Sequence, residues 1–154
     1  MAEHNRLVAI IFMLVACISS AVASETVNFQ HLSLNSMFPQ ITINGLYQDE
    51  SGVLWIGTKD GVKKYNGNYI ESVNFMGINN WIQSNLVPTI CGDKKGHLYV
   101  NTDYSIIEYD LIKEESRIIF SQPNTQILPS IAFNYGINSL WIGLLDSVYN
   151  YKEG

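Results

Sequence analysis

Charge of either sign is sparse in this chain of 154 residues, because only 15% of its residues are Asp, Glu, Lys or Arg. Acidic residues outnumber basic ones by 14 to 9, and the formal net charge at pH 7 is -5. The pairs Lys63-Lys64 and Lys94-Lys95 are isolated and form no basic stripe that could neutralise phosphates. The composition therefore argues against a nucleic acid partner.

Cysteine is equally scarce, with Cys17 and Cys91 as the two examples. Cys17 lies in a segment that we expect to be removed, so no intrachain disulfide is expected. Cys91 follows a strand-like run, where a lone cysteine usually packs as a small hydrophobic residue. A nucleophilic role would need a histidine partner, and only His31 and His97 remain for that role.

The first 24 residues differ from the rest of the chain. A modest positive start at Arg6 is followed by an apolar run over residues 7–16 and by small residues at 21–23. This order predicts a signal peptide over residues 1–24 and a periplasmic location for the remainder.

Two alternatives to ordinary cleavage stay open. Leu14-Val-Ala-Cys17 resembles a bacterial lipobox, in which Cys17 would carry the lipid anchor. The apolar run over residues 7–23 is also just long enough to remain as an uncleaved membrane anchor. Export is expected on all three readings, and ordinary cleavage ranks first.

A degraded repeat dominates the rest of the sequence. The segment Trp55-Ile-Gly-Thr58 aligns with Tyr99-Val-Asn-Thr102 and with Trp141-Ile-Gly-Leu144, in steps of 44 and 42 residues. Each copy has a residue that tolerates positive φ three positions earlier and a tyrosine ten positions later: Gly52, Gly96 and Asn138, then Tyr65, Tyr109 and Tyr151. A period near 43 residues with short strands is typical of one four-stranded propeller blade.

Each repeat divides into strand-like phrases separated by turns. The first predicts strands at 41–48, 53–58, 62–65 and 69–75. The second predicts strands at 88–92, 98–102, 105–109 and 117–120. The third predicts strands from about 128, at 140–144 and at 147–151, without a fourth. Asp60-Gly61 predicts a type I′ hairpin, because both residues tolerate positive φ.

These phrases predict an all-β fold of about three β-propeller blades, each a four-stranded antiparallel meander. The blade repeats lie near 40–75, 87–120 and 128–154, within a partial propeller over 25–154. Consecutive apolar residues around Trp55 and Trp141 indicate strands buried on both faces, with both tryptophans in the core. Gly57 and Gly143 are expected to allow close backbone approach.

Three copies in phase argue against a plain β-sandwich. Known propellers use about 4–8 blades, so three would form an incomplete ring. We therefore expect a fragment of a longer protein, or a partner that completes the ring.

The first copy resembles the two-component regulator propeller repeat, whose pattern is approximately Asp-x-x-Gly-x-Leu-Trp-Ile-Gly-Thr-x-x-Gly-Leu-x-x-Tyr-x-Gly. Residues 49–67 match nearly every specified position of this pattern, with Val62 where Leu is commoner. We call the aromatic position of each copy, Trp55, Tyr99 or Trp141, its anchor. The second copy has Tyr99 for Trp and Asn101 for Gly. The third keeps Leu140-Trp-Ile-Gly143 but loses the turn glycine, and the resemblance covers about Phe29 to the C-terminus.

In that family such repeats form the extracytoplasmic sensor region of hybrid two-component histidine kinases, and many members sense oligosaccharides. The resemblance implies the N-terminal fragment of a periplasmic sensing propeller that is not itself catalytic. Its implied partners are an oligosaccharide bound by the complete propeller and the remaining blades of a parent protein, with a homodimer as a further arrangement. A periplasmic or lipid-anchored propeller enzyme acting on glycans, or an interaction scaffold, is the alternative, since fold does not fix function.

Motifs that carry chemistry are few. Asp49 and Asp93 recur just before turns, which favours capping of the turn over acid–base catalysis. Asp60 and Asp103 lie in hairpins, where a structural role is also expected. His31 and His97 have no metal-ligand spacing, and no cofactor, metal or catalytic site is predicted.

Trp81 is the one ligand-contact candidate. It lies in the Asn-rich segment Met76-Gly-Ile-Asn-Asn-Trp-Ile-Gln83, which belongs to no strand phrase. A tryptophan flanked by amides could stack on a sugar ring, although packing between blades is the more ordinary role.

Overall fold

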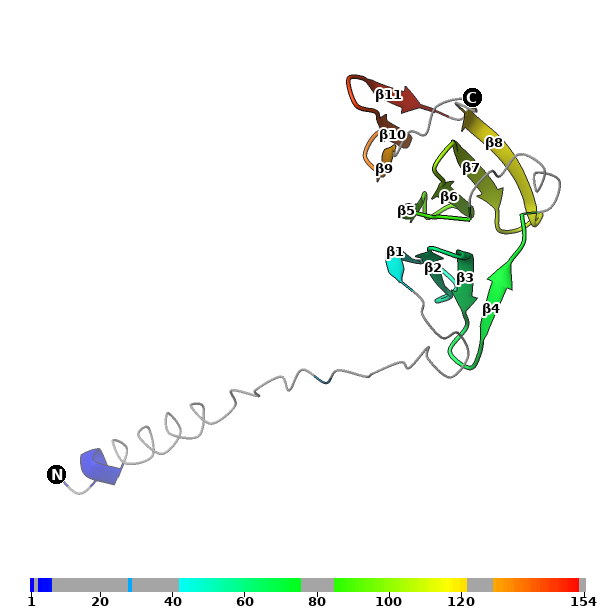
Figure 1. The fold of residues 1–154 in the computed structure, drawn as a ribbon. Helices are drawn as coiled ribbons and strands as arrows, with labels where there is room; N and C mark the ends of the chain where they lie inside the picture. Colours follow the sequence, from blue (N-terminus) through cyan, green and yellow to red (C-terminus); the bar gives the residue numbers. More distant parts are fainter. Residues whose placement is uncertain (2, 7–27, 29–41, 76–84, 122–128, 153–154) are drawn as a thin grey trace. The chain divides into compact units, whose positions relative to one another are not determined.

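The computed structural model describes residues 1, 3–6, 28, 42–75, 85–121 and 129–152. Two compact units are distinguished, Met1–Ser33 and Leu34–Gly154. In the first unit, residues 3–6 form one turn of helix, and all the strands belong to the second unit (Figure 1). Among the described residues, no helix has both the length and the apolar character needed to cross a membrane. The predicted cleavage site and the alternatives at 7–23 lie outside the described residues.

The second unit contains three antiparallel sheets, named blades 1, 2 and 3 in chain order. Blade 1 comprises β1 (Ile43–Gln48), β2 (Leu54–Thr58), β3 (Gly61–Tyr65) and β4 (Ile70–Val73). Blade 2 comprises β5 (Thr89–Gly92), β6 (His97–Asn101), β7 (Ser105–Asp110) and β8 (Glu115–Ser121). Blade 3 comprises β9 (Ser130–Asn134), β10 (Ser139–Gly143) and β11 (Val148–Tyr151). In every sheet, strands that follow one another in sequence pair with each other, which confirms the predicted meanders.

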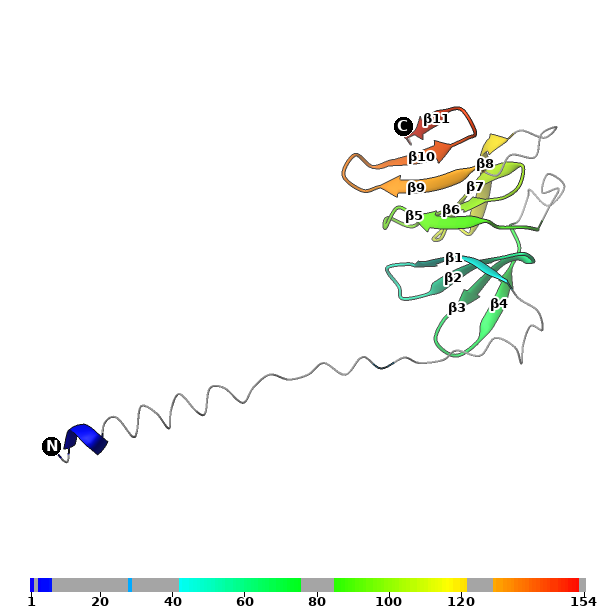
Figure 2. The same cartoon turned by 60° about the vertical axis from the view of Figure 1, so that its left-hand side comes forward.

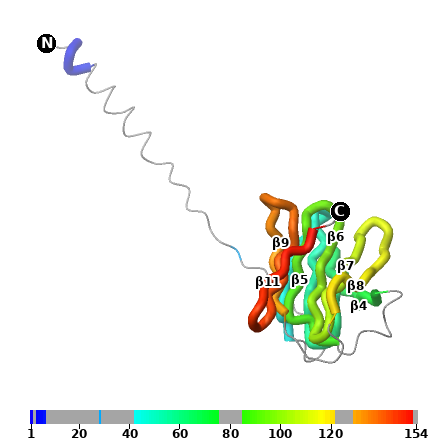
Figure 3. The backbone as a smooth tube through the Cα atoms, turned by 90° about the horizontal axis from the view of Figure 1, so that it is seen from above, coloured from blue at the N-terminus to red at the C-terminus, as the bar shows by residue number. Residues whose placement is uncertain are grey.

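The blades lie side by side through their first strands. β1 contacts β5 and β5 contacts β9, while β4 and β8 form the opposite edges of blades 1 and 2 (Figures 1 and 2). The view from above shows blade 3 beside blade 2 (Figure 3). The first strand of each blade therefore lies against the first strand of a neighbouring blade.

Blade 2 is buried on both faces. Leu98, Val100 and Ile107 pack in one apolar cluster with Trp55 and Val62 of blade 1. Tyr99 and Ile106 pack in a second cluster with residues of blade 3, namely Ile131, Leu140 and Ile142. Full burial of each such side chain contributes about 1.5–3 kcal/mol to folding. The consecutive apolar residues of β6 therefore pack against blade 1 on one face and blade 3 on the other, as predicted.

Trp141 corrects one prediction, because it is not a core residue. It is 38% exposed, compared with 6% for Trp55 and 3% for Tyr99 at the equivalent positions. Since side chains alternate along a strand, Leu140 and Ile142 face blade 2 and Trp141 faces the other way. Within the described ranges no sheet packs on that side of blade 3.

The hairpin between β2 and β3 corrects a second prediction. Gly61 has φ of 81°, but Asp60 is not among the residues with positive φ, so the turn is not type I′. Thr58 Oγ1 accepts the amide of Asp60 at 2.9 Å and donates to the Gly61 carbonyl at 2.7 Å. A single positive φ at the residue that closes the loop is typical of a G1 bulge.

Close approach at Gly57 is confirmed. A Cβ atom at this position would lie 2.9 Å from Cγ1 of Val87, and one at Gly143 would lie 3.0 Å from Oγ of Ser130. Val87 also donates its amide to the Thr58 carbonyl at 2.9 Å. Gly57 thus lets the chain that enters blade 2 lie directly against blade 1.

Candidate functional site

The carboxylate of Asp49 caps the turn that precedes β2 in blade 1. Asp49 Oδ1 accepts the amides of Ser51 at 2.9 Å and Val53 at 3.1 Å. Asp49 Oδ2 accepts the indole N–H of Trp55 at 2.7 Å. Burial raises the pKa of Asp49, but the bonds from Ser51, Trp55 and the turn amides outweigh burial and hold the pKa below its ordinary value.

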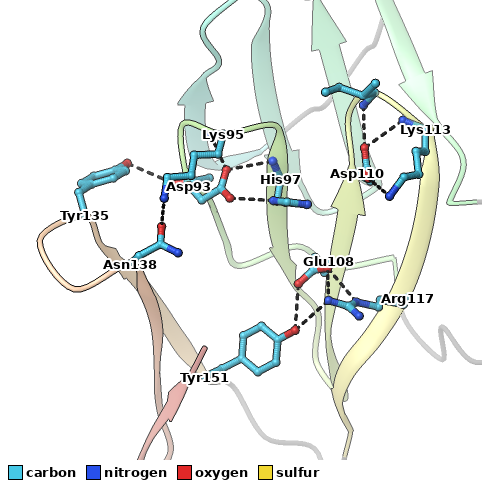
Figure 4. Close-up of polar contacts among 12 residues, drawn as sticks. Asp93, Lys95, His97, Glu108, Asp110, Lys113, Arg117, Tyr135, Asn138 and Tyr151 are labelled. Atoms are coloured by element: carbon cyan, nitrogen blue, oxygen red, sulfur yellow. Dashed lines mark hydrogen bonds and ion pairs between the residues drawn. The ribbon is translucent and has the colours of Figure 1, made fainter. Parts of the chain in front are cut away.

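Asp93 repeats this arrangement in blade 2. Its Oδ1 accepts the amides of Lys95 at 2.7 Å and His97 at 3.0 Å. Its Oδ2 lies 2.7 Å from Nδ1 of His97 (Figure 4). The capping role predicted for Asp49 and Asp93 is therefore confirmed, although the last contact goes to an imidazole instead of an indole.

Asp60 and Asp103 were expected to stabilise their hairpins. In the structure a threonine hydroxyl closes each hairpin instead, Thr58 in blade 1 and Thr102 in blade 2. Thr102 Oγ1 accepts the amide of Ser105 at 3.0 Å, as Thr58 Oγ1 accepts the amide of Asp60. Both threonines are buried. The signal was present in the sequence as the last residue of the motifs Trp-Ile-Gly-Thr and Tyr-Val-Asn-Thr.

A tyrosine of blade 3 joins an ion pair of blade 2. Glu108 is 4% exposed, and its Oε1 accepts from Nε of Arg117 at 2.8 Å and from the terminal Nη2 at 2.7 Å. Tyr151 of β11 donates its hydroxyl to Glu108 Oε2 at 3.2 Å and accepts from Arg117 at 3.0 Å (Figure 4). The three side chains form one closed network, named the blade 2–3 lock.

Two further contacts join these blades at the turn between β5 and β6 and the turn between β9 and β10. Lys95 Nζ donates to Asn138 Oδ1 at 2.7 Å, and the Tyr135 hydroxyl donates to the Gly92 carbonyl at 3.2 Å (Figure 4). The two blades are therefore joined by polar contacts as well as by their apolar cluster.

A small cavity of about 200 Å³ lies beside the blade 2–3 lock. Its walls carry both signs of charge, from His97, Glu108, Asp110, Lys113, Glu115, Ser116 and Arg117. Lys113 binds Asp110 at 3.0 Å, and the bonds from Lys113 lower the pKa of Asp110 to about 2. Four of the charged lining residues are paired, Lys113 with Asp110 and Arg117 with Glu108.

A larger cavity of about 440 Å³ lies where blades 1 and 2 meet, and we name it the inter-blade hollow. Trp55 and Tyr109 line it as a T-shaped pair with ring centroids 6.0 Å apart. Lys64 and Glu114 contribute charge to the same lining. Lys64 also binds Glu71 at 3.0 Å. An aromatic and aliphatic lining with polar groups around it suits a small polar ligand that has one apolar face.

Of the other sequence candidates, Trp81 and His31 lie outside the described residues. Cys91 is half-buried beside the second apolar cluster, and burial raises the pKa of its thiol to about 12. This agrees with a packing role for Cys91. Within the part of the chain that the structure describes, no group of three or more His, Cys, Asp or Glu residues is placed to hold a metal ion.

Comparison with known proteins supports the repeat. Residues 37–60 match the family described as two component regulator propeller. A comparison with curated proteins gave no match.

Two solved structures from B. thetaiotaomicron have similar folds. The extracellular domain described as that of the hybrid two component system BT4673 is 16% identical, with a TM-score of 0.58 over 71% of this chain and 15% of that one. The corresponding domain of BT3049 is 16% identical, with a TM-score of 0.52 over 65% of this chain and 15% of that one. The chain thus spans about 15% of the length of each structure. The predicted resemblance and the predicted propeller-blade fold are both confirmed.

Proposed function

Because this chain carries a two component regulator propeller repeat, we propose that it is the N-terminal part of the extracellular ligand-sensing propeller of a hybrid two-component sensor. In this role it binds and transmits, and does not catalyse. The observation that carries the proposal is the stacking of three repeat-encoded blades in the fold of such sensor domains. Their extracellular placement supports export of this chain to the periplasm.

The exposed side of blade 3 supports the idea that further blades belong to the same assembly. The anchor aromatic of each blade points toward the next one: Trp55 pairs with Tyr109 of blade 2, and Tyr99 stacks on Phe133 of blade 3 at 5.7 Å. Trp141 occupies the equivalent position and is 38% exposed. Another blade of a parent protein would bury this indole in the same manner.

We propose an oligosaccharide as the class of ligand. The inter-blade hollow supports this class, because Lys64 and Glu114 beside its apolar walls offer charged groups that can hydrogen-bond to sugar hydroxyls. Trp81 remains a proposed stacking residue. Asp49, Asp93 and Glu108 are engaged in turn caps and an ion pair, which suits a binding module better than a hydrolase.

The first experiment reads the genomic sequence beyond codon 154. The proposal expects an open frame with further repeats, a membrane span and histidine kinase motifs. A stop codon with no such sequence would remove the basis for a sensor fragment.

The ligand class is tested separately by thermal unfolding of the full chain with a panel of neutral and acidic oligosaccharides. A saturable rise in midpoint with one member is the expected result. The variant Trp81→Ala should lose that rise if Trp81 is a stacking residue, while Trp141→Ala should keep it. If the parent protein responds only to ligands other than glycans, the proposed ligand class is wrong.

A further inference from the structure

Three acidic side chains are buried in the described part of the chain, and two of them have a basic partner. Asp93 is 6% exposed and lies beside His97, and Glu108 is 4% exposed and binds Arg117. Asp103 is 5% exposed, and its Oδ1 has no hydrogen-bond partner among the described residues. An ionised carboxylate in such surroundings is normally paired with a cation or bound to a metal.

A second buried oxygen lies two residues away. Asn101, at the end of β6, is fully buried, and its Oδ1 also lacks a hydrogen-bond partner within the described ranges. The orientation of the amide is fixed, because Nδ2 of Asn101 donates to the carbonyl of Pro129. The unpartnered atom is therefore the carbonyl oxygen, which can only accept a hydrogen bond or coordinate a cation.

The loop that carries these oxygens is held firmly. Thr102, between the two residues, donates its amide to the Ser105 carbonyl at 2.8 Å, and its Oγ1 accepts the Ser105 amide at 3.0 Å. Thr102 and Ser105 are themselves buried. These bonds fix the backbone between the two residues, so Asn101 and Asp103 are held two positions apart at the end of β6.

We propose that Asn101 Oδ1 and Asp103 Oδ1 are ligands of a site for one oxygen-coordinated divalent cation of the Ca²⁺ class. Carboxylate oxygens and side-chain amide carbonyls are ligands that Ca²⁺ prefers, with backbone carbonyls and water completing its coordination. One carboxylate predicts weak binding, with a Kd of about 10⁻⁴–10⁻³ M as in other extracellular modules.

Repeat comparison supports a local role for this pair. The equivalent of Asn101 is Gly57 in blade 1 and Gly143 in blade 3, and the equivalents of Asp103 are Lys59 and Leu145. Neither of the other hairpins can supply the same two oxygens. The site is therefore expected once, in blade 2, and its occupancy would stiffen the central blade of the three.

The test is thermal unfolding of the full chain after chelator treatment, with Ca²⁺ added at constant ionic strength. Saturating Ca²⁺ should raise the midpoint of the wild type by about 2–5 °C. The variant Asp103→Asn should show no such rise. Its metal-free midpoint should equal or exceed that of the wild type, since an uncompensated buried charge is removed. Asp146→Asn, in the exposed hairpin of blade 3, is the matched control and should keep the full rise.

Direct binding provides a second measurement that does not depend on stability. Tb³⁺, which replaces Ca²⁺ at oxygen sites, should give luminescence sensitised by Tyr104, with a stoichiometry near one and displacement by Ca²⁺. No binding of Ca²⁺ or Tb³⁺ by the wild type would overturn the proposal and would leave a bridging water as the partner of both oxygens. Equal binding by Asp103→Asn would overturn it as well.

Discussion

The indole N–H of Trp55 donates to Asp49 Oδ2 at 2.7 Å, six residues back along the chain. This bond ties the anchor residue of the repeat to the turn that precedes its strand. In blade 2 the anchor is Tyr99, and Asp93 Oδ2 instead lies 2.7 Å from the imidazole of His97. The repeat therefore keeps the capping carboxylate and changes the group that satisfies its second oxygen.

Replacing Trp55 by Phe should destabilise the chain by about 1–3 kcal/mol. The substitution removes the donor to Asp49 and part of the packing against Tyr109 in a buried position. Trp141→Phe is the control and should change the free energy of unfolding by less than about 0.5 kcal/mol, because the ring is exposed. Urea unfolding followed by circular dichroism gives both values. Equal losses would mean that Trp55 has no special role.

Acid should unfold the chain partly through Asp49. Its pKa is lowered in the folded state, so the carboxylate contributes stability that is present above its ordinary pKa of 3.8. That contribution is lost as the pH falls below about 4 and through the folded pKa. Asp49→Asn should therefore be less stable than the wild type at pH 7 and converge toward it near pH 3. Urea midpoints measured from pH 7 to pH 3 test this convergence. A constant difference across the range would contradict it.

The blade 2–3 lock should show energetic coupling between Glu108 and Tyr151. Tyr151→Phe removes the hydroxyl that bonds to both Glu108 and Arg117. In a double-mutant cycle with Glu108→Gln, we expect a coupling energy of about 0.5–2 kcal/mol. Tyr149→Phe, on the same strand, is the control, because its ring is kept and no hydrogen bond of its hydroxyl is present among the described residues. Additive effects of the two lock substitutions would show that the contact does not join the blades energetically.

Much of this fold could be predicted from local pattern. The Asp-x-x-Gly turn, the anchor aromatic and the strand lengths are short-range features, so the strands and the capping by Asp49 and Asp93 were accessible from the sequence. The lock was not, since Glu108 and Tyr151 are 43 residues apart, and the repeat that marks Tyr151 gives no sign of its partner.

The two wrong predictions, for Trp141 and for the Asp60-Gly61 turn, also failed because the deciding contacts lie outside the local pattern. Trp55 and Trp141 have the same local sequence, and their exposure differs because of which sheet lies opposite. The Asp60-Gly61 pair predicts type I′, but the Thr58 hydroxyl stabilises a different closure of the loop. The two unpartnered oxygens of Asn101 and Asp103 depend on burial by residues distant in sequence, which no local pattern reports.

Cys91 should resist alkylation in the folded chain. Burial raises the pKa of its thiol to about 12 from an ordinary value of 9.0, so at pH 8 the reactive thiolate is about a thousandfold scarcer than in an unperturbed cysteine. Iodoacetamide labelling followed by peptide mapping distinguishes Cys91 from Cys17 in the same sample. Labelling of Cys91 should become fast when urea unfolds the chain, which serves as the control. Rapid labelling of Cys91 without denaturant would mean that β5 opens readily, and that blade 2 is not held between its neighbours as tightly as its two apolar clusters require.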